Sequence, residues 1–435
     1  MVKLLRGRAA PLPSGSARSG YLRTLTRVLW PGEAAAVEPR RPHGRPARVE
    51  YLVIPDARHP RLLVPAGNRT AAAAAVRHFR RRETVAGRFA VRALAAGLRT
   101  GAVPVLLPHR VRVRPCSREE PAGTPEAPEA IEDHLRRVLG DDLVLGIQLG
   151  GPARANRKPV LQVAGRTGEP VAFVKIGVDE LTRRLVRNER LALDSLRAAG
   201  LRDVQVPEVL HAGAWGEQEI LVQSVLPTWR RPAPYDPGRL ARAMREIASV
   251  GGIRTEELAG SGYWTGLAGR VDGLAGRPEA ADVLRTACAR VAGRWSGLRL
   301  PFGAWHGDWS GWNMAFRPDR LLVWDWERFT RPVPVGFDAV HHRFQGLAAA
   351  GRLQPGAAVD ATLAAAADIL RPWAFDAERA QAVALLYLLD IATRYAADGQ
   401  DETGARLGDL WTRLPAVLDD RLSRSTGGRS GEVTA

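Results

Sequence analysis

The sequence predicts an α+β chain, in which a small antiparallel sheet is preceded by a basic α/β region and followed by a mostly helical region. Three observations predict this order. Short apolar runs broken by turn residues begin after Asp142, at LVLGIQLGG, PVLQVAG and PVAFVKIG, which is typical of antiparallel strands. Apolar residues recur with helical spacing through most of the last ~200 residues. Positive charge is concentrated before residue 141.

The region before residue 141 differs in charge from the rest of the chain. It carries 26 basic and 11 acidic side chains, a net +15 of the total +17. A Pro/Arg-rich start through about Pro46 precedes two β-like runs, VEYLVIP and PRLLVPA. Helices are expected near Thr70–Arg82 and Val85–Arg99, then a β-like stretch near Val103–Arg114. We expect residues 1–114 to form a basic N-terminal extension of unknown role and residues 115–140, with the Pro/Glu-rich PCSREEPAGTPEAPEA, a linker and connecting helix.

Two interpretations of this basic extension stay open. Arginine contacts phosphate well, so the extension could bind nucleic acid, an anionic membrane surface or an acidic partner. Alternatively its arginines simply form a solvated basic face. This chain uses arginine in place of lysine throughout, since Lys3, Lys158 and Lys175 are the only lysines among its 63 basic side chains. No specific nucleic-acid module is recognisable, and arginines interspersed with alanine also suit amphipathic helices packed on the rest of the protein.

The segment HGDWSGWN, from His306 to Asn313, carries the clearest chemistry, together with Asp325 at the end of the apolar run LLVWD. Mg²⁺ prefers hard oxygen ligands such as carboxylates and amide carbonyls, which Asn313 and Asp325 could supply. Asp308 lies five residues before Asn313, so one short loop can hold its carboxylate near an acceptor hydroxyl. The pattern indicates a phosphoryl-transfer site.

The pattern H-G-D-x4-N, followed by an apolar strand ending in Asp, resembles the aminoglycoside phosphotransferase and choline kinase group, relatives of the protein kinases. The resemblance implies a protein-kinase-like two-lobe fold over about residues 141–422, with an N-lobe at 141–227, a helical C-lobe at 228–422 and a flexible tail at 423–435. It also implies roles for single residues: Asp308 as catalytic base, His306 holding the loop, Asn313 and Asp325 binding Mg²⁺, and Asp338 of Gly336-Phe337-Asp338 bracing the active-site loops.

The same resemblance implies a strand lysine that binds nucleotide phosphates and a helix glutamate that pairs with it. Lys175 lies in PVAFVKIG, where a compact ammonium on a flexible stem could reach the α- and β-phosphates. An exposed strand lysine is the alternative. A helix is expected from about Asp179 to Ala199, with Glu189 as the interior carboxylate. Glu180 is the second choice, since the helix dipole alone explains an acidic residue in the first turn.

The loop expected to cover the phosphates contains Gly150, Gly151 and Arg154 but no GxGxxG pattern. Its backbone amides or Arg154 could contact phosphate, and an ordinary hairpin loop explains it equally well. Two further strands, in VPEVLHAGAW and EILVQSVLP, lead to a hinge at about Leu221–Pro227, where backbone groups would bind the purine. The sequence leaves ATP and GTP both open.

Helical spacing predicts six helices after the hinge, near Pro237–Val250, Glu279–Gly297, Gly336–Ala350, Ala357–Leu370, Asp376–Ala397 and Glu402–Leu418. Five of the twelve tryptophans lie between residues 305 and 326. They either pack the loop against the helices, or some of them, with Trp309, Trp312 and Trp326 as candidates, stack on the acceptor.

The leading hypothesis is a Mg²⁺-dependent phosphotransferase that moves the γ-phosphate of ATP or GTP to a hydroxyl of a small molecule, such as a sugar, amino sugar, amino alcohol or aminoglycoside-like compound. Residues 226–435 carry 26 basic and 24 acidic side chains, which disfavours a strongly cationic acceptor. Three alternatives stay open: a metal-dependent hydrolase using His306, Asp308, His341 and His342; Asp and Asn residues that merely cap loops; and a non-catalytic nucleotide-binding regulatory module docked through the basic N-terminus.

The sequence also predicts a cytoplasmic location. No apolar run approaches the ~20 residues of a membrane span, and the charged start MVKLLRGRAAPLPSG lacks the apolar core of a secretory signal. Cys116 and Cys288 are too few for a disulfide framework and have no metal-type spacing.

Overall fold

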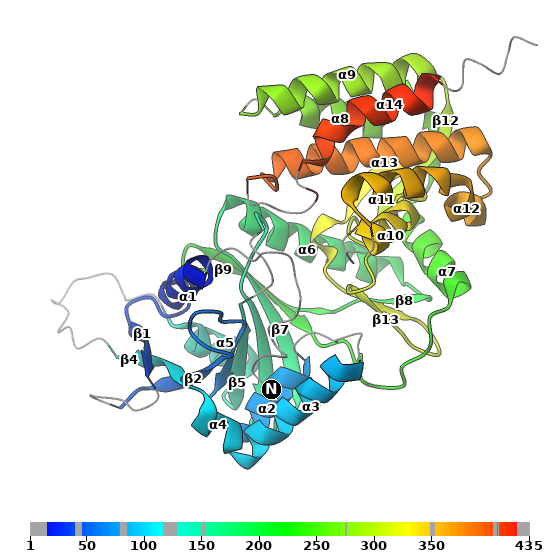
Figure 1. Ribbon diagram of the computed structural model, residues 1–435. Helices are drawn as coiled ribbons and strands as arrows, with labels where there is room; N and C mark the ends of the chain where they lie inside the picture. The colour runs from blue at the N-terminus through cyan, green and yellow to red at the C-terminus, as the bar shows by residue number, and fades with distance from the viewer. Residues whose placement is uncertain are drawn as a thin grey trace, which may run out of the picture. The chain divides into compact units, whose positions relative to one another are not determined.

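The computed structural model describes residues 15–39, 46–78, 85–115, 129–149, 154–274, 276–348, 353–402, 407 and 409–423. The chain divides into two compact units (Figure 1). The sheet unit comprises Met1–Ala153, Arg157–Arg187 and Glu208–Val225, and the helical unit comprises Arg154–Asn156, Asn188–Pro207 and Leu226–Ala435. An antiparallel sheet unit and a mostly helical unit confirm the predicted α+β class.

The sheet unit is built on nine antiparallel strands in the order β1-β4-β2-β3-β5-β6-β7-β10-β9. Their bounds are β1 Ala34–Pro39, β2 Val49–Ile54, β3 Leu62–Pro65, β4 His109–Arg114, β5 Leu143–Gln148, β6 Val160–Gly165, β7 Pro170–Gly177, β9 Val209–Trp215 and β10 Gln218–Ser224. The pair β3 and β5, in which Leu63 lies opposite Ile147, joins strands of residues 1–114 to those of residues 141–227. The basic extension and the expected N-lobe therefore share one sheet.

Side chains that alternate along the strands build a core on each face of this sheet. In β2, Tyr51 and Val53 point into the core covered by α1 (Gly15–Leu29) and α5 (Ile131–Leu139). Leu52 and Ile54 point into the other core, covered by α2 (Arg69–His78) and α3 (Val85–Thr100), as Figure 1 shows. The short α4 (Ala102–Leu106) completes the second layer and occupies part of the stretch expected to be β-like. Both faces are thus buried.

A buried carboxylate connects the first core to its helices. Glu132 of α5 accepts hydrogen bonds from the indole N–H of Trp30, at 2.9 and 2.8 Å, and from the Tyr51 hydroxyl at 2.7 Å. Burial raises the pKa of Glu132, while these donors and the nearby Arg48 guanidinium oppose the rise. Because an unsatisfied buried carboxylate is costly, this cluster fixes how α1, β2 and α5 meet.

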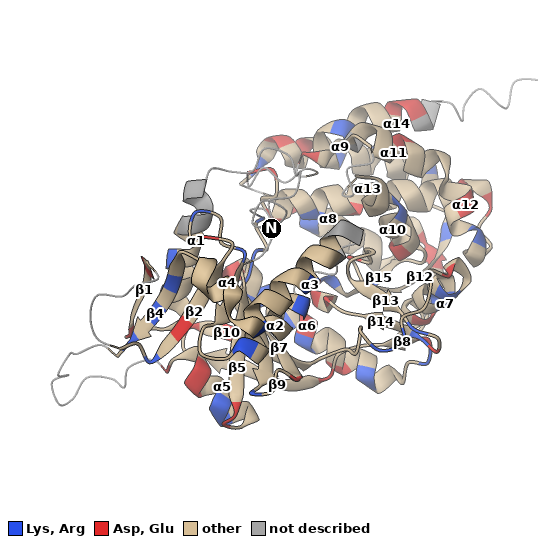
Figure 2. Ribbon diagram, turned by 60° about the horizontal axis from the view of Figure 1, so that its bottom comes forward, with Lys and Arg blue, Asp and Glu red and all other residues tan. Residues whose placement is uncertain are grey.

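Ion pairs engage the arginines of β4. Arg112, whose side chain is 4% exposed, lies 3.1 Å from Glu38 and 3.2 Å from Glu50, and Arg114 pairs with Glu38. Arg110 pairs with Glu50 at 3.2 Å. Figure 2 shows basic residues of β4 beside an acidic residue of β2. Part of the N-terminal positive charge is therefore balanced within the sheet.

The helical unit contains two three-stranded sheets, β11-β12-β15 and β13-β14-β8, and helices that follow α6 (Glu180–Ala199). The helices are α7 Pro237–Ala248, α8 Gly262–Asp272, α9 Pro278–Trp295, α10 Phe337–Ala348, α11 Pro355–Ala364, α12 Ala366–Leu370, α13 Ala377–Ala397 and α14 Leu414–Ser423. The strands are β8 Val204–Gln205, β11 Arg254–Glu257, β12 Arg299–Trp305, β13 Met314–Phe316, β14 Leu321–Val323 and β15 Thr330–Pro334. Short 3-10 turns cover Leu258–Gly260, Trp326–Arg328, Arg371–Trp373 and Leu410–Arg413.

The helix α13 lies at the centre of the helical unit's core, and most of its residues from Ala380 to Ala396 are buried. Such a helix is apolar around most of its circumference, which agrees with the long run AVALLYLLDIA. Among the described residues, no helix combines the length and apolar character that crossing a membrane requires.

Two helices expected in this region differ in detail from the structure, and several elements of the structure were not expected. The helix expected at Ala357–Leu370 is broken at Ala365 into α11 and α12, and the one expected at Glu402–Leu418 is a 3-10 turn followed by α14 in the described residues. The sequence gives no prediction of helix α8 or of the strands of the small sheets, except for β14, which lies in the apolar run before Asp325. The strands β8 and β13 have two and three residues, too few to show an alternating pattern.

We expect a chain shortened to begin at Glu129 to lose the stability of the sheet unit, because β5 would lose its partner β3 and the first core its helix α1. The midpoint of thermal unfolding should fall by about 10 °C or more, with aggregation through the new sheet edge. Calorimetry and gel filtration would measure both effects. A shortened chain that stays monomeric at an unchanged midpoint would contradict the continuity of the sheet.

Candidate active site

The loop that follows β12 is held by a buried carboxylate from the start of α10. Asp338 accepts hydrogen bonds from the backbone N–H of His306, at 2.8 Å, and of Gly307, at 3.2 Å. Burial raises the pKa of Asp338 to about 7, and these two N–H groups oppose the rise. Gly307 has φ +82°, and a Cβ there would lie 2.3 Å from the carbonyl oxygen of Arg328. The loop can therefore take this path only with glycine at its second position.

The imidazole of His306 connects this loop to the segment that follows β14 and contains Asp325. Its Nε2 lies 3.0 Å from the carbonyl oxygen of Trp324, and its Nδ1 accepts from the backbone N–H of Asp308 at 3.1 Å. An Nδ1 that accepts and an Nε2 that donates define a neutral imidazole. Burial lowers the pKa of His306 to about 4, which agrees with this state. His306 is thus a fixed internal brace.

The carboxylate of Asp308 is held from two sides and remains 32% exposed. Its Oδ1 accepts from the Ser310 hydroxyl at 3.2 Å and lies 3.0 Å from His341 Nε2. Its Oδ2 accepts from the amide of Asn313 at 3.1 Å. Burial would raise the pKa of Asp308, but the hydrogen bond from His341 and the positive charge of Arg394 lower it. An ionised, oriented and accessible carboxylate can accept a proton from a bound hydroxyl.

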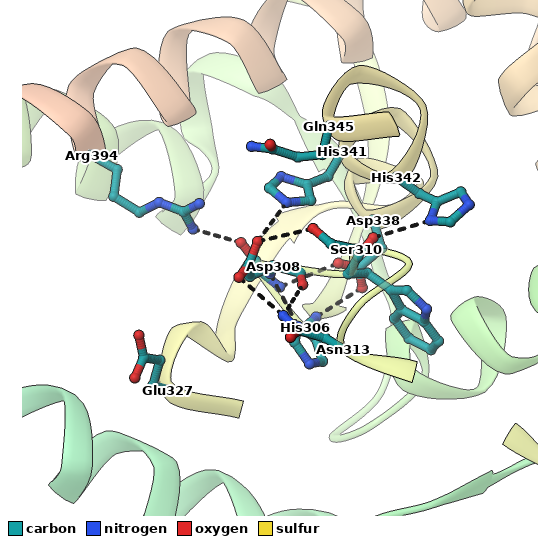
Figure 3. A network of polar contacts seen from close by, with 12 residues as sticks. His306, Asp308, Ser310, Asn313, Glu327, Asp338, His341, His342, Gln345 and Arg394 are labelled. Carbon is teal, nitrogen blue, oxygen red and sulfur yellow. Dashed lines mark hydrogen bonds and ion pairs between the residues drawn. The ribbon is translucent and has the colours of Figure 1, made fainter. Parts of the chain in front are cut away.

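A chain of hydrogen bonds behind Asp308 orients it (Figure 3). His341 on α10 is fully buried, and its Nδ1 lies 3.0 Å from the hydroxyl of Tyr387 on α13. Burial lowers the pKa of His341, so the imidazole is neutral, with Nε2 donating to Asp308 and Nδ1 accepting from Tyr387. The core of the helical unit therefore positions the carboxylate through rigid helices.

Asn313 and Asp325 are brought together by the hairpin of β13 and β14. Met314 lies opposite Val323, and the backbone N–H of Trp324 donates to the carbonyl oxygen of Asn313 at 3.0 Å. The two hydrogens of the Asn313 amide are used on the carbonyl oxygen and carboxylate of Asp308, at 2.9 and 3.1 Å. The amide oxygen is left available for another partner. Asn313 and Asp325, which are twelve residues apart in sequence, thus lie at the same end of one hairpin.

The region around Asp325 is rich in carboxylates. Oxygens of Glu189, Asp325 and Glu327 lie within 4.8 Å of one another, so among the described residues this group of carboxylates could hold a metal ion. Asp325 has φ +72°, a left-handed conformation that is rare for residues other than glycine and clusters at functional sites. Glu189 and Glu327 are buried. Carboxylates this close together favour a bound cation, because it offsets their mutual repulsion.

The remaining predicted residues lie on other elements. Lys175 is buried in β7 of the sheet unit, between Val160 of β6 and Leu221 of β10. Glu189 is on α6 in the helical unit, where its carboxylate accepts from the backbone N–H of Trp326 at 3.3 Å. Arg154 is exposed in the same unit. Gly150 and Gly151 lie outside the described residues.

The tryptophans of the segment are divided between packing and exposure. Trp309 and Trp326 are fully buried and surround the His306 ring, with ring centroids 5.8 and 4.4 Å from it. The packing interpretation is therefore correct for these two. Trp312 is 46% exposed, next to Asn313, and is the member of the three candidates that a bound molecule can reach.

Several residues around Asp308 could not be predicted from the sequence. Ser310, Tyr387 and Arg394 are common types without a characteristic spacing, whereas Glu327 could have been found from its position two residues after Asp325. His341 was considered only as a metal ligand. In the structure its ring bonds Asp308 and Tyr387, and both ring nitrogens of His306 are also occupied. The geometry therefore disfavours the hydrolase hypothesis.

Comparison with known proteins gives likeness of structure only, since no protein-family model and no curated protein match the sequence. Similar structures include a thermostable mutant of aminoglycoside phosphotransferase APH(4)-Ia, with 17% identity, TM-score 0.44 and coverage of 68% of this chain and 99% of that one. A protein assigned as a fructosamine-3-kinase from Haemophilus somnus has 14% identity, TM-score 0.38 and coverage of 65% and 96%. A choline/ethanolamine kinase family protein from Mesorhizobium loti has 17% identity, TM-score 0.37 and coverage of 63% and 90%.

These structures come from the same group of proteins that the motif from His306 to Asn313 resembles. At these identities and TM-scores, the likeness says nothing about the activity, substrate or cofactor of this chain.

We expect His306 to make stability depend on pH. Its pKa is about 4 in the folded protein and near 6.5 when unfolded, so between these values the unfolded chain binds the extra proton. The free energy of unfolding should therefore rise with pH in this window, by about 3 kcal/mol from this group. The variant His306→Asn lacks this contribution, so its destabilisation relative to wild type should be larger at pH 7 than at pH 4. Denaturant unfolding at both pH values is the measurement, and parallel pH profiles would refute the assignment.

Proposed function

We propose that this protein is a Mg²⁺-dependent phosphotransferase of the aminoglycoside phosphotransferase and choline kinase group, which moves the γ-phosphate of ATP or GTP to a hydroxyl of a small molecule. The observation that carries the proposal is the arrangement of the loop from His306 to Asn313. One loop holds an accessible carboxylate, Asp308, and the amide of Asn313, and the backbone of Asn313 bonds Trp324, the residue before Asp325.

Asp308 is the proposed base. Two donors occupy Oδ1 and one occupies Oδ2, so Oδ2 is better able to accept a hydrogen bond from an acceptor hydroxyl. As the hydroxyl oxygen forms its bond to the γ-phosphorus, its proton passes to Asp308. The bond to the nucleoside diphosphate breaks at the same centre. Positioning of this kind, rather than covalent catalysis, supplies most of the rate in phosphoryl transfer.

The residues present fit a divalent cation. The amide oxygen of Asn313 and the carboxylates of Asp325, Glu189 and Glu327 are hard oxygen donors of the type that Mg²⁺ prefers. We assign Asn313 and Asp325 as ligands of this cation, and Glu327 as a further ligand. When bound, the ion would neutralise phosphate charge during transfer. Asp338 and His306 hold the loop from which Asn313 projects.

The assignments on the nucleotide side rest on the motif resemblance. Lys175 would contact the α- and β-phosphates, with Glu189 as the carboxylate that orients it. Gly150, Gly151 and Arg154 would contribute backbone amides and a guanidinium to the phosphates. Because Glu189 also lies in the carboxylate group of Asp325, it has two proposed roles, to be separated by Mg²⁺ titration of a Glu189→Gln variant.

The N-terminal region has no proposed polyanion partner. The arginines Arg110, Arg112 and Arg114 form ion pairs with Glu38 and Glu50, which supports a structural role for them. An anionic or membrane partner for residues 1–114 therefore lacks support from the described side chains of β4.

The test is Mg²⁺-dependent nucleotide consumption by the purified protein against sugars, amino sugars, amino alcohols and aminoglycosides. Asp308→Asn should lower kcat by about 10²–10⁴-fold with nucleotide binding retained, because the proton acceptor is lost while the residues proposed to contact the nucleotide are unchanged. Calorimetric titration with Mg²⁺ and the nucleotide measures binding separately. Tight binding without turnover on any acceptor would favour a non-catalytic nucleotide-binding module. An unchanged kcat in Asp308→Asn would contradict the assignment of Asp308 as the base.

We expect His341 to act as a positioning residue. His341→Ala removes the donor to Asp308 Oδ1, so kcat should fall by about 10-fold or more while KM for the nucleotide changes little. His341→Gln, which can place an amide N–H near the former Nε2, should recover part of the loss. His342→Ala is the matched control, since His342 on the same helix bonds the carbonyl oxygen of Trp309 rather than Asp308. Equal losses in all three variants would indicate a general packing defect.

A further inference from the structure

Arg394, near the end of α13, reaches the loop beside Asp308 without a carboxylate of its own. Its guanidinium donates to the carbonyl oxygen of Gly307 at 2.7 Å. It also lies over the rings of Trp305 and Tyr395, at 5.6 and 5.8 Å from their centroids. In the described part of the chain, no carboxylate lies within ion-pair distance of it. One hydrogen bond leaves most of its five N–H groups available.

The other arginines that meet α13 are neutralised. Arg328 pairs with Asp398 at the end of the helix, and Arg270 pairs with Asp390 at 2.5 Å. These two aspartates are therefore already used, and they cannot serve a cationic molecule bound near Asp308 without breaking an ion pair. Among the described residues, Arg394 is the arginine of α13 beside the catalytic loop that has no carboxylate within ion-pair distance.

A half-buried cation between aromatic rings is costly unless an anion compensates it. Arg394 also lowers the pKa of Asp308, so its charge is felt at the proposed base. Figure 3 shows Arg394 and Asn313 on different sides of Asp308, with Arg394 approaching from α13 and Asn313 lying beneath. The guanidinium thus approaches Asp308 from the side of α13, a different side from Asn313.

We propose that Arg394 binds an anionic group of the acceptor, so that the substrate is a hydroxyl compound carrying a carboxylate or a phosphate rather than an amine. This inference rests on the proposed phosphotransferase function. Arg394 forms a charge-assisted, two-pronged pair with the anion and directs a hydroxyl of the same molecule toward Asp308 Oδ2. A protonated amine would meet the guanidinium instead of a carboxylate and be repelled.

The experiment compares four acceptors with one carbon skeleton: a hexose, its uronic acid, its 6-phosphate and its 2-amino derivative. With saturating Mg²⁺ and nucleotide, kcat/KM for one of the two anions should exceed that of the neutral hexose by about tenfold or more, and the amino sugar should be poorest. The uronic acid and the phosphate distinguish the two sources of anion. Arg394→Gln should abolish the preference through KM of the acceptor, and Arg394→Lys should keep part of it.

Arg379→Gln is the matched control, because Arg379 is exposed on the same helix and pairs with Asp376 away from the loop. This variant should leave kcat/KM for every acceptor unchanged. An anion preference that survives Arg394→Gln, or a wild type that prefers the amino sugar, would overturn the proposal. So would an Arg394→Gln variant in which kcat falls equally for all acceptors and KM for the nucleotide rises, since Arg394 would then act on the transferred phosphoryl group.

Failure of the proposed function is distinguishable from failure of this inference. If no acceptor is phosphorylated, the phosphotransferase assignment fails, and the charge preference is measured by calorimetric titration of the same four compounds with Mg²⁺ and a non-hydrolysable nucleotide. Binding of an anion that depends on Arg394 would support the inference. Equal affinity for all four compounds, or no binding, would overturn it.

Discussion

The buried carboxylate of Asp338, which accepts the backbone N–H groups of His306 and Gly307, is the constraint on which the candidate site depends. Buried backbone donors must be satisfied, and here one side chain satisfies two consecutive ones at the point where the chain leaves β12. The left-handed turn at Gly307 follows from this anchoring, and it turns Asp308 away from the strand. His306 then completes the frame by bonding the carbonyl oxygen of Trp324, the residue after β14. The position of one carboxylate thus constrains the loop that carries both the proposed base, Asp308, and the proposed metal ligand Asn313.

Two layers of hydrogen bonding act on Asp308 in different ways. Ser310 and Asn313 come from its own loop, so they adjust with it, whereas His341 and Tyr387 come from rigid helices of the core. For the proposed reaction, orientation of Asp308 by the second kind of contact requires no further ordering, because folding has already fixed the helices. This explains why α13, one of the most deeply buried helices of the helical unit, also carries residues around the site.

Charge is handled differently in the two units. In the sheet unit the arginines of β4 meet glutamates across neighbouring strands, so a region with a large positive charge is also a partly balanced one. In the helical unit acidic and basic residues are nearly equal in number, yet among the described residues Arg394 has no carboxylate within ion-pair distance. Net charge is therefore a poor guide to the charge at a site, since Coulomb interactions depend on the nearest partners and on burial.

The sequence by itself determined the α+β class, the helix that contains Glu189 and the segment that carries Asp308, Asn313 and Asp325. These are local properties, in which hydrophobic period and fixed spacing act within one element or one hairpin. Only the tertiary structure decided that residues 1–114 share a sheet with the residues after 141, that His341 supports Asp308 instead of binding metal, and that Arg394 lies beside the loop. Each of these brings together residues far apart in sequence, such as Gly307 and Arg394, and no local pattern encodes which helix face will meet which loop. Burial also distinguishes the three tryptophans that the sequence offers for stacking on the acceptor. Trp309 and Trp326 are buried, and Trp312 is accessible.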